Sequence, residues 1–127
     1  MTPYHRPVPF AWWLGRRVYT LFVVRELTSV FIAAYVVLLL RLLHTLTLGR
    51  EAYEAYLRSL AAPGMVVFHV VALAAAVYHS VTWFGLSPKA MVIRVGQKQA
   101  PAGIIVGANY LAWIAVSAII AWLVLRG

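Results

Sequence analysis

Three long apolar stretches restrict the fold of this sequence more than any other feature. The stretches from Ser59 to Pro88 and from Gln99 to Leu125 contain no Lys, Arg, Asp or Glu. Each exceeds the roughly 20 residues that a helix needs to cross a bilayer core about 30 Å thick. The composition agrees, because 64% of the residues are hydrophobic and 11% are charged, whereas soluble domains carry about 25% charged residues. The sequence therefore predicts a membrane protein.

The first apolar stretch, at about 19–48, is less uniform because it contains Arg25, Glu26, Arg41 and His44. We interpret it as a permanent anchor, since no small-residue cleavage site follows closely and two further spans come after it. The predicted fold is an all-α membrane protein with a single domain over residues 1–127. Its three transmembrane helices are expected at about 19–48, 62–87 and 101–125.

Two residues are predicted to end the spans, and a short helix is predicted between the first two. Gly49 suits the end of the first helix. Pro88 should stop the second, because proline lacks a backbone N–H and restricts the residue before it. The segment at about 51–60 could form an amphipathic helix on the outer membrane surface. Its apolar residues at helical spacing are Tyr53, Tyr56, Leu57 and Leu60.

The distribution of basic residues predicts the orientation. They gather in the N-terminal segment up to Arg25 and in the second loop: Arg6, Arg16, Arg17, Arg25, Lys89, Arg94 and Lys98. The N-terminus and the second loop should therefore face the cytoplasm, with the first loop and the C-terminus outside. The net charge of +8 lies at the ends of apolar runs, which argues against nucleic-acid binding. The chain has no cysteine, so it can hold no disulfide and no Cys-ligated zinc or iron–sulfur cluster.

Ionisable residues inside a span indicate function, because burying them in the bilayer is costly. Two polar clusters stand out. Near the cytoplasmic end of the first span lie Arg25, Glu26, Thr28 and Ser29. At a similar depth in the second span lie His79, Thr82 and Trp83, with His79 and Trp83 four residues apart on one face. Simpler roles are also open: Arg25 could reach lipid headgroups, and His79 could hydrogen-bond to a neighbouring helix. Together these groups suit a quinone, whose oxygens need hydrogen-bond donors and whose redox chemistry moves protons.

Two other histidines, His44 and His69, fall toward the outer side of the membrane. On different helices at similar depth, they are weak candidates for axial ligands of a b-type haem. Each is also explained singly, His44 as an interfacial residue and His69 as a helix-packing residue. We expect no haem and no other metal site.

Several segments resemble one protein family over most of the chain. The residues that carry the resemblance are Tyr4, Arg6, Pro7, Trp12–Trp13, Arg25-Glu26-Leu27-Thr28 and His79-Ser80-Val81-Thr82-Trp83-Phe84-Gly85-Leu86-Ser87-Pro88-Lys89-Ala90. In these positions the sequence is similar to the C subunit of the four-subunit bacterial fumarate reductase, one of its two small membrane anchors.

The resemblance implies a chain that is not an enzyme by itself but a multi-pass anchor in the bacterial inner (plasma) membrane. It implies three partners: a flavoprotein subunit with FAD, an iron–sulfur subunit at the cytoplasmic face, and the D subunit as a second membrane anchor. It also implies a menaquinol-oxidising site and no haem in the anchors. The family residues of that site fall on Arg25, Glu26, Ser29, His79 and Trp83.

From these residues we expect Arg25 and His79 or Trp83 to donate hydrogen bonds to quinone oxygens, and Glu26 to accept a proton. Three alternatives stay open. The chain could be a haem b-binding succinate dehydrogenase anchor, a small transporter subunit, or a purely structural anchor without a quinone contact. A transporter would need a carboxylate near the bilayer midplane, and all three Glu residues lie toward the span ends.

Overall fold

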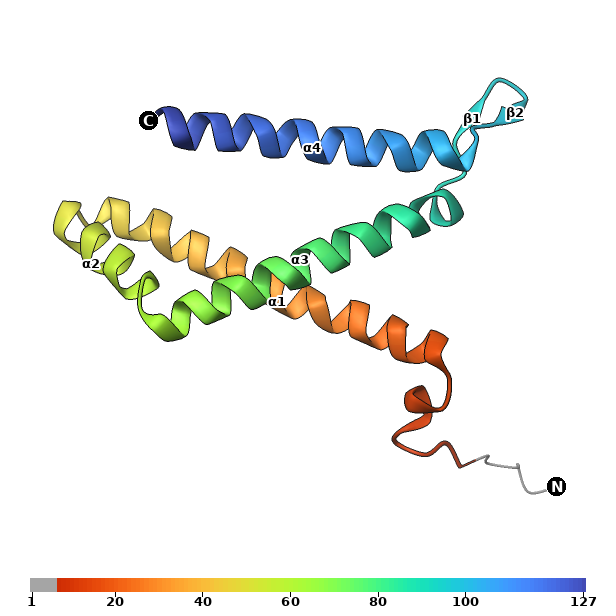
Figure 1. The fold of residues 1–127 in the computed structure, drawn as a ribbon, viewed down its shortest axis with the longest axis horizontal. Coiled ribbons are helices and arrows are strands. Elements are labelled where there is room, and N and C mark those ends of the chain that lie inside the picture. The colour runs from red at the N-terminus through yellow and green to blue at the C-terminus, as the bar shows by residue number, and fades with distance from the viewer. Residues whose placement is uncertain (1–6) are drawn as a thin grey trace. The chain divides into compact units, whose positions relative to one another are not determined.

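The computed structural model describes residues 7–127, so Tyr4 and Arg6 lie outside the described residues. Figure 1 shows the order of the elements along the chain. They are the 3-10 helix η1 (Trp12–Gly15), α1 (Arg17–Thr47), α2 (Arg50–Leu60), α3 (Pro63–Ala90), β1 (Arg94–Val95), β2 (Lys98–Gln99) and α4 (Ala102–Arg126). The helices α1, α3 and α4 are long and apolar enough to cross a membrane. The predicted three spans are therefore confirmed, while their orientation stays a prediction.

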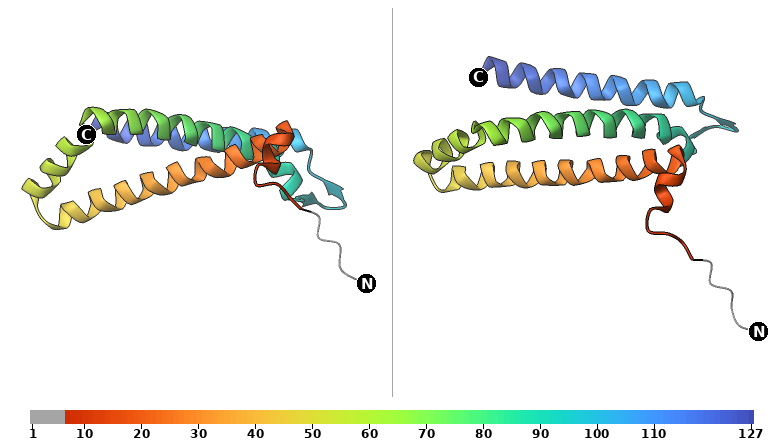
Figure 2. Two further views of the ribbon diagram at one scale, coloured as in Figure 1. Left: turned by 90° about the horizontal axis from the view of Figure 1, so that it is seen from below. Right: turned by 60° about the horizontal axis from the view of Figure 1, so that its bottom comes forward.

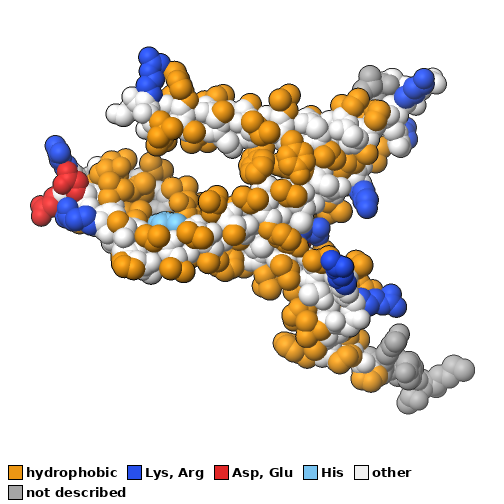
Figure 3. All heavy atoms as spheres, viewed as in Figure 1, with side chains coloured by type: hydrophobic (Ala, Val, Ile, Leu, Met, Phe, Trp, Pro, Cys, Tyr) orange, Lys and Arg blue, Asp and Glu red, His pale blue; other side chains and the backbone are white. Residues whose placement is uncertain are grey.

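The spans are covered almost entirely by exposed apolar side chains. Within the most hydropathic windows of α1, α3 and α4, only 6%, 11% and 6% of residues are buried. Figure 3 shows hydrophobic side chains along the helices, while charged side chains gather at their ends and on α2. Such a surface is stable only where lipid or partner helices cover it, because exposing apolar area to water costs about 25 cal/mol per Å².

The end of α3 differs from the prediction, because the helix continues through Pro88 to Ala90. Proline at position 88 removes one backbone hydrogen bond, the one that would go to the carbonyl of Phe84. The Ser87 hydroxyl donates to that same carbonyl oxygen at 2.9 Å, and Met91 N–H bonds to the Ser87 carbonyl at 2.9 Å. The side chain thus replaces the missing donor and the last turn stays helical.

Two compact units make up the chain, Met1–His79 and Ser80–Gly127. In the first, α2 joins α1 to the beginning of α3 (Figure 2). Gly49 separates α1 from α2 with a φ of 106°, a value that favours glycine, as predicted for the end of the first helix. The predicted helix at 51–60 is confirmed as α2. Its Tyr56 hydroxyl donates to the Leu38 carbonyl of α1 at 3.2 Å, so this side chain of α2 packs on α1.

Aromatic rings fix α1 against α3 within this first unit. The rings of Tyr35 and Phe68 stack with centroids 6.5 Å apart, and Phe31 lies 6.5 Å from the same Phe68 ring. The Tyr35 and His69 rings meet edge to face at 5.6 Å. Ala72 and Ala75 are the buried hydrophobic residues of α3, and their small size lets helices approach closely.

The second unit contains the end of α3, the ribbon of β1 and β2, and α4. The Asn109 amide of α4 donates to the Ser87 hydroxyl at 2.8 Å, and the Phe84 ring lies edge to face with Tyr110 at 5.0 Å. The strands pair antiparallel, Arg94 opposite Gln99, around Gly96 with a φ of 65°. This ribbon was not predicted from the sequence, so the all-α prediction holds apart from these short strands.

Candidate functional site

The candidate site lies in the first third of α1, where the polar residues of the span are concentrated. The first unit brings part of it together around His79 of α3. Thr28 is the buried polar residue of the described chain, with 9% of its surface exposed. Its position between two long helices makes it the contact point between the polar segment of α1 and the imidazole of α3.

His79 is held through its Nδ1 atom. The Thr28 Oγ1 atom lies 3.1 Å from Nδ1, and the Arg25 carbonyl oxygen lies 3.4 Å from it. The Thr28 hydroxyl donates its hydrogen to the Arg25 carbonyl, so the Thr28 oxygen is left to accept from the ring. Because both of these neighbours of Nδ1 accept, Nδ1 carries the hydrogen in the neutral imidazole, and Nε2 carries the lone pair.

This tautomer changes the expected role of His79. A neutral imidazole whose hydrogen sits on Nδ1 has its acceptor at Nε2. The expectation that His79 donates a hydrogen bond to a quinone oxygen would require the protonated ring. The geometry favours acceptance of a hydrogen bond from a hydroxyl.

Arg25 and Glu26 form an ion pair beside this contact. The Arg25 Nε atom lies 3.3 Å from Glu26 Oε1, and the two side chains are 13% and 48% exposed. The Arg25 guanidinium also lies over the Phe22 ring, 5.0 Å from its centroid. The guanidinium is therefore largely sheltered while the carboxylate remains open to whatever surrounds α1.

On α1, His79 contacts Thr28 and the Arg25 carbonyl. Glu26 pairs with the Arg25 guanidinium. Glu26 and Thr28 point in directions about 200° apart around α1, given about 100° per residue. The carboxylate thus faces nearly the opposite side of α1 from the imidazole contact. Ser29 donates its hydroxyl to the Glu26 carbonyl, so its oxygen remains an acceptor rather than a free donor.

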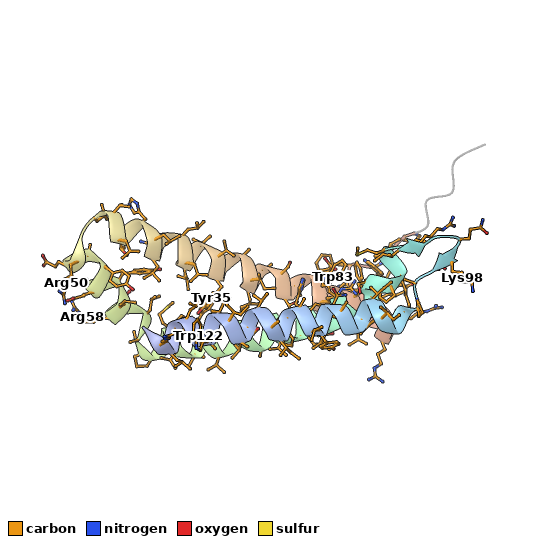
Figure 4. The ribbon with its side chains drawn as sticks, turned by 90° about the horizontal axis from the view of Figure 1, so that it is seen from above. Tyr35, Arg50, Arg58, Trp83, Lys98 and Trp122 are labelled. Carbon is orange, nitrogen blue, oxygen red and sulfur yellow. The ribbon has the colours of Figure 1, made fainter. Side chains whose placement is uncertain are left out.

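Trp83, the fifth predicted residue and labelled in Figure 4, belongs to α3 and is 39% exposed. Its spacing of four residues puts it on the same side of that helix as His79. An indole at this position offers an N–H donor and a flat apolar surface. Both features suit an aromatic ligand bearing oxygen atoms.

The two haem candidates, His44 and His69, lie on different helices, α1 and α3. His44 lies in the last turn of α1. The His69 Nε2 atom lies 3.3 Å from the Leu60 carbonyl oxygen, while its buried Nδ1 atom has no partner in the described residues. His69 also lines an apolar cavity of about 370 Å³ with Tyr35, Ala72 and Ala76 among others. No group of three or more potential metal ligands occurs in residues 7–127. That the chain binds no haem stays a prediction.

Thr28 was predicted from the sequence as a member of the polar cluster of the first span, but it was not among the predicted quinone-binding residues. The signal that could have found it is its spacing: Thr28 follows Arg25 by three residues, which places both on one face of α1. Its hydroxyl was a weak clue because threonine in a span commonly bonds to its own helix backbone.

Comparison with known proteins identifies the family of the chain. Residues 1–125 match the family model that describes the C subunit of fumarate reductase. The chain is 42% identical over 125 residues to the fumarate reductase C subunit of Mycobacterium tuberculosis (strain ATCC 25177 / H37Ra), covering 98% of this chain and 99% of the relative. Proteins with the same name match from Klebsiella pneumoniae (strain 342), 38% identical over 83% of this chain and 81% of the relative, and from Aliivibrio fischeri (strain MJ11), 34% identical over 92% and 90%. The chain therefore belongs to the family of fumarate reductase C subunits.

Proposed function

We propose that this chain anchors a fumarate reductase complex in the bacterial inner membrane and contributes to its menaquinol-oxidising site. Family membership and three spanning helices make it a multi-pass membrane anchor subunit of that complex. The finer part, the quinol site, is supported by one observation above all. The imidazole of His79 is held through Nδ1 by the Thr28 hydroxyl and the Arg25 carbonyl, beside the Arg25–Glu26 ion pair of the same segment.

The proton chemistry follows from this arrangement. Oxidation of menaquinol to menaquinone releases two electrons and two protons. His79 Nε2 accepts a hydrogen bond from one quinol hydroxyl and then takes its proton, while Glu26, whose carboxylate faces another side of α1, takes the second proton through water. The electrons pass to the iron–sulfur subunit. The Arg25 Nε atom lies 3.3 Å from Glu26 Oε1, so the cation stands beside the carboxylate that takes the second proton.

Trp83 and Arg25 serve the remaining needs of a quinol. The indole provides a flat surface for the ring and a donor for an oxygen atom. The guanidinium provides donors that bind more strongly once the hydroxyl oxygen loses its proton. Ser29 contributes an oxygen beside Glu26. The proposed site thus has hydrogen-bond acceptors for the quinol and hydrogen-bond donors for the quinone.

The partners follow from the same proposal. The iron–sulfur and flavoprotein subunits dock at the cytoplasmic face, where the N-terminus and the second loop lie in the predicted orientation. The ribbon of β1 and β2 carries Arg94 and Lys98, and Lys98 projects from it (Figure 4). A second anchor subunit covers part of the exposed apolar surface of the spans.

Glu26→Gln and His79→Gln test the quinol site. Each removes a proton acceptor and keeps a polar side chain of similar size. General acid–base groups contribute about 10² to 10⁴ in rate, so quinol-dependent fumarate reduction should fall by about 10²-fold in each variant. Fumarate reduction by a soluble electron donor should be unchanged, because that donor bypasses the membrane site.

Glu54→Gln is the matched control. It removes the carboxylate of the other Arg–Glu pair in the described chain, in which Arg50 Nε lies 2.7 Å from Glu54 Oε1, on α2. Quinol activity should stay at the wild-type level. Equal loss of both activities in the Glu26 variant would indicate failed assembly, and unchanged quinol activity in both test variants would leave only a structural anchor.

A further inference from the structure

A second cavity lies where the chain enters α1. The residues before the helix fold back against its first turns and border an open cavity of about 450 Å³, whose lining residues are all exposed. Its lining residues are Pro7, Val8, Pro9, Trp12, Arg16 and Tyr19. The Trp12 and Tyr19 rings meet edge to face at 5.3 Å, and the Thr20 hydroxyl donates to the Trp13 carbonyl at 2.9 Å. These contacts hold η1 onto α1, so the cavity is a built feature of the fold.

The charge in this cavity is not neutralised by an acidic side chain of the described residues. Arg16 lines it, and neither of the two salt bridges in the described part of the chain includes Arg16. The whole sequence has only three acidic residues, Glu26, Glu51 and Glu54. The first turn of α1 contains none, and no side chain caps it. The positive end of the helix dipole therefore adds to the Arg16 charge.

The position of the cavity limits what can fill it. It lies at the first residues of a membrane-spanning helix, which is the depth of lipid headgroups. Trp and Tyr are the side chains enriched at that depth. Its walls are mainly apolar, and its one charged group among the lining residues is a guanidinium, which binds phosphate through a fork of N–H donors.

We propose that this cavity binds the phosphate of an anionic phospholipid, with Arg16 holding the phosphate and Trp12 and Tyr19 contacting the glycerol and first acyl carbons. A free phosphate ion would find a single cation and mostly apolar walls, which is a poor replacement for its water shell. A phospholipid can contact both the Arg16 guanidinium, through its phosphate, and the apolar walls, through its glycerol and acyl carbons. This inference does not depend on the quinol site.

Arg16→Gln and Arg17→Gln provide a matched pair, because each removes one positive charge at the same membrane boundary and only Arg16 lines the cavity. The full chain, with the subunits that copurify, would be placed in phosphatidylcholine nanodiscs with increasing phosphatidylglycerol. Retained phosphatidylglycerol would be measured by native mass spectrometry. Arg16→Gln should weaken retention about tenfold, the loss expected for one charge-assisted hydrogen bond. Arg17→Gln should change it less than twofold, and Arg16→Lys should restore part of it.

Three results would overturn the proposal. Equal weakening by both Gln variants would mean diffuse attraction of the basic segment to the anionic surface. Displacement of phosphatidylglycerol by inorganic phosphate would mean a site for the free ion. Crosslinking of position 16 to an acidic segment of a copurifying subunit, with no lipid retained, would mean a protein contact. Circular dichroism of each variant checks that the helices are intact.

Discussion

Replacing Thr28 with valine tests how His79 is oriented. Valine keeps the volume and β-branching of threonine, so packing between α1 and α3 should change little. It removes the oxygen that lies 3.1 Å from His79 Nδ1 and the hydroxyl that donates to the Arg25 carbonyl. Of these two acceptors, the Nδ1–H group keeps only the Arg25 carbonyl, which lies at 3.4 Å.

The size of the effect follows from the strength of the hydrogen bond that valine cannot make. One hydrogen bond contributes about 0.5–1.5 kcal/mol net. If that energy holds the ring in the productive orientation, its removal lowers the productive population by about 2- to 13-fold, since about 1.4 kcal/mol is a factor of ten. Quinol-dependent kcat/KM in the Thr28→Val complex should therefore fall about fivefold. The fall should be much smaller than that of His79→Gln, which removes the acceptor itself.

The assay compares two electron donors in the same purified complex. Quinol-dependent fumarate reduction should fall while reduction by a soluble donor stays constant. Thr28→Ser, which keeps the hydroxyl, should lie within twofold of wild type. The reasoning is refuted if Thr28→Val keeps full quinol activity, or if Thr28→Ser loses as much as Thr28→Val.

Three further predictions concern the fold and its orientation. Ser87→Ala should lower the midpoint of thermal unfolding of the solubilised complex, because it leaves the Phe84 carbonyl without the donor that lies at 2.9 Å and costs about 1–3 kcal/mol; an unchanged midpoint would show that water replaces the hydroxyl. Gly49→Ala should lower the free energy of unfolding by about 1 kcal/mol or more, and with it the midpoint, because Gly49 has a φ of 106° that alanine adopts only with strain. A stabilised variant would contradict this. Because the chain has no cysteine, Lys98→Cys and Arg58→Cys can be labelled singly in intact cells with an impermeant thiol reagent, and only Arg58→Cys should react if the second loop is cytoplasmic.

The helices could be predicted because their cause is local. A bilayer offers no partner for backbone N–H and C=O groups, so an apolar run of about 20 residues must satisfy them within a helix. The runs that end at Pro88 and Leu125 therefore identified their spans without any knowledge of packing. The amphipathic spacing at 51–60 likewise identified α2.

The exact end of α3 could not be predicted from Pro88 alone. The rule that proline ends a helix assumes that the freed carbonyl stays unpaired. The Ser87 side chain satisfies the Phe84 carbonyl, and the Asn109 amide fixes that hydroxyl from α4. The Ser87–Phe84 hydrogen bond is local, whereas the Asn109–Ser87 hydrogen bond joins residues 22 positions apart in sequence, so only the tertiary structure could reveal the pair of contacts.

The candidate site, like the end of α3, could be predicted only in part from the sequence. The sequence alone determined which ionisable residues lie inside the spans, since Arg25, Glu26 and His79 are conspicuous in apolar surroundings. Only the tertiary structure decided that Thr28 contacts His79 and which ring nitrogen of His79 carries the hydrogen. An ionisable residue in an apolar run is visible in the sequence, whereas the direction of each side chain depends on how helices distant in sequence pack together.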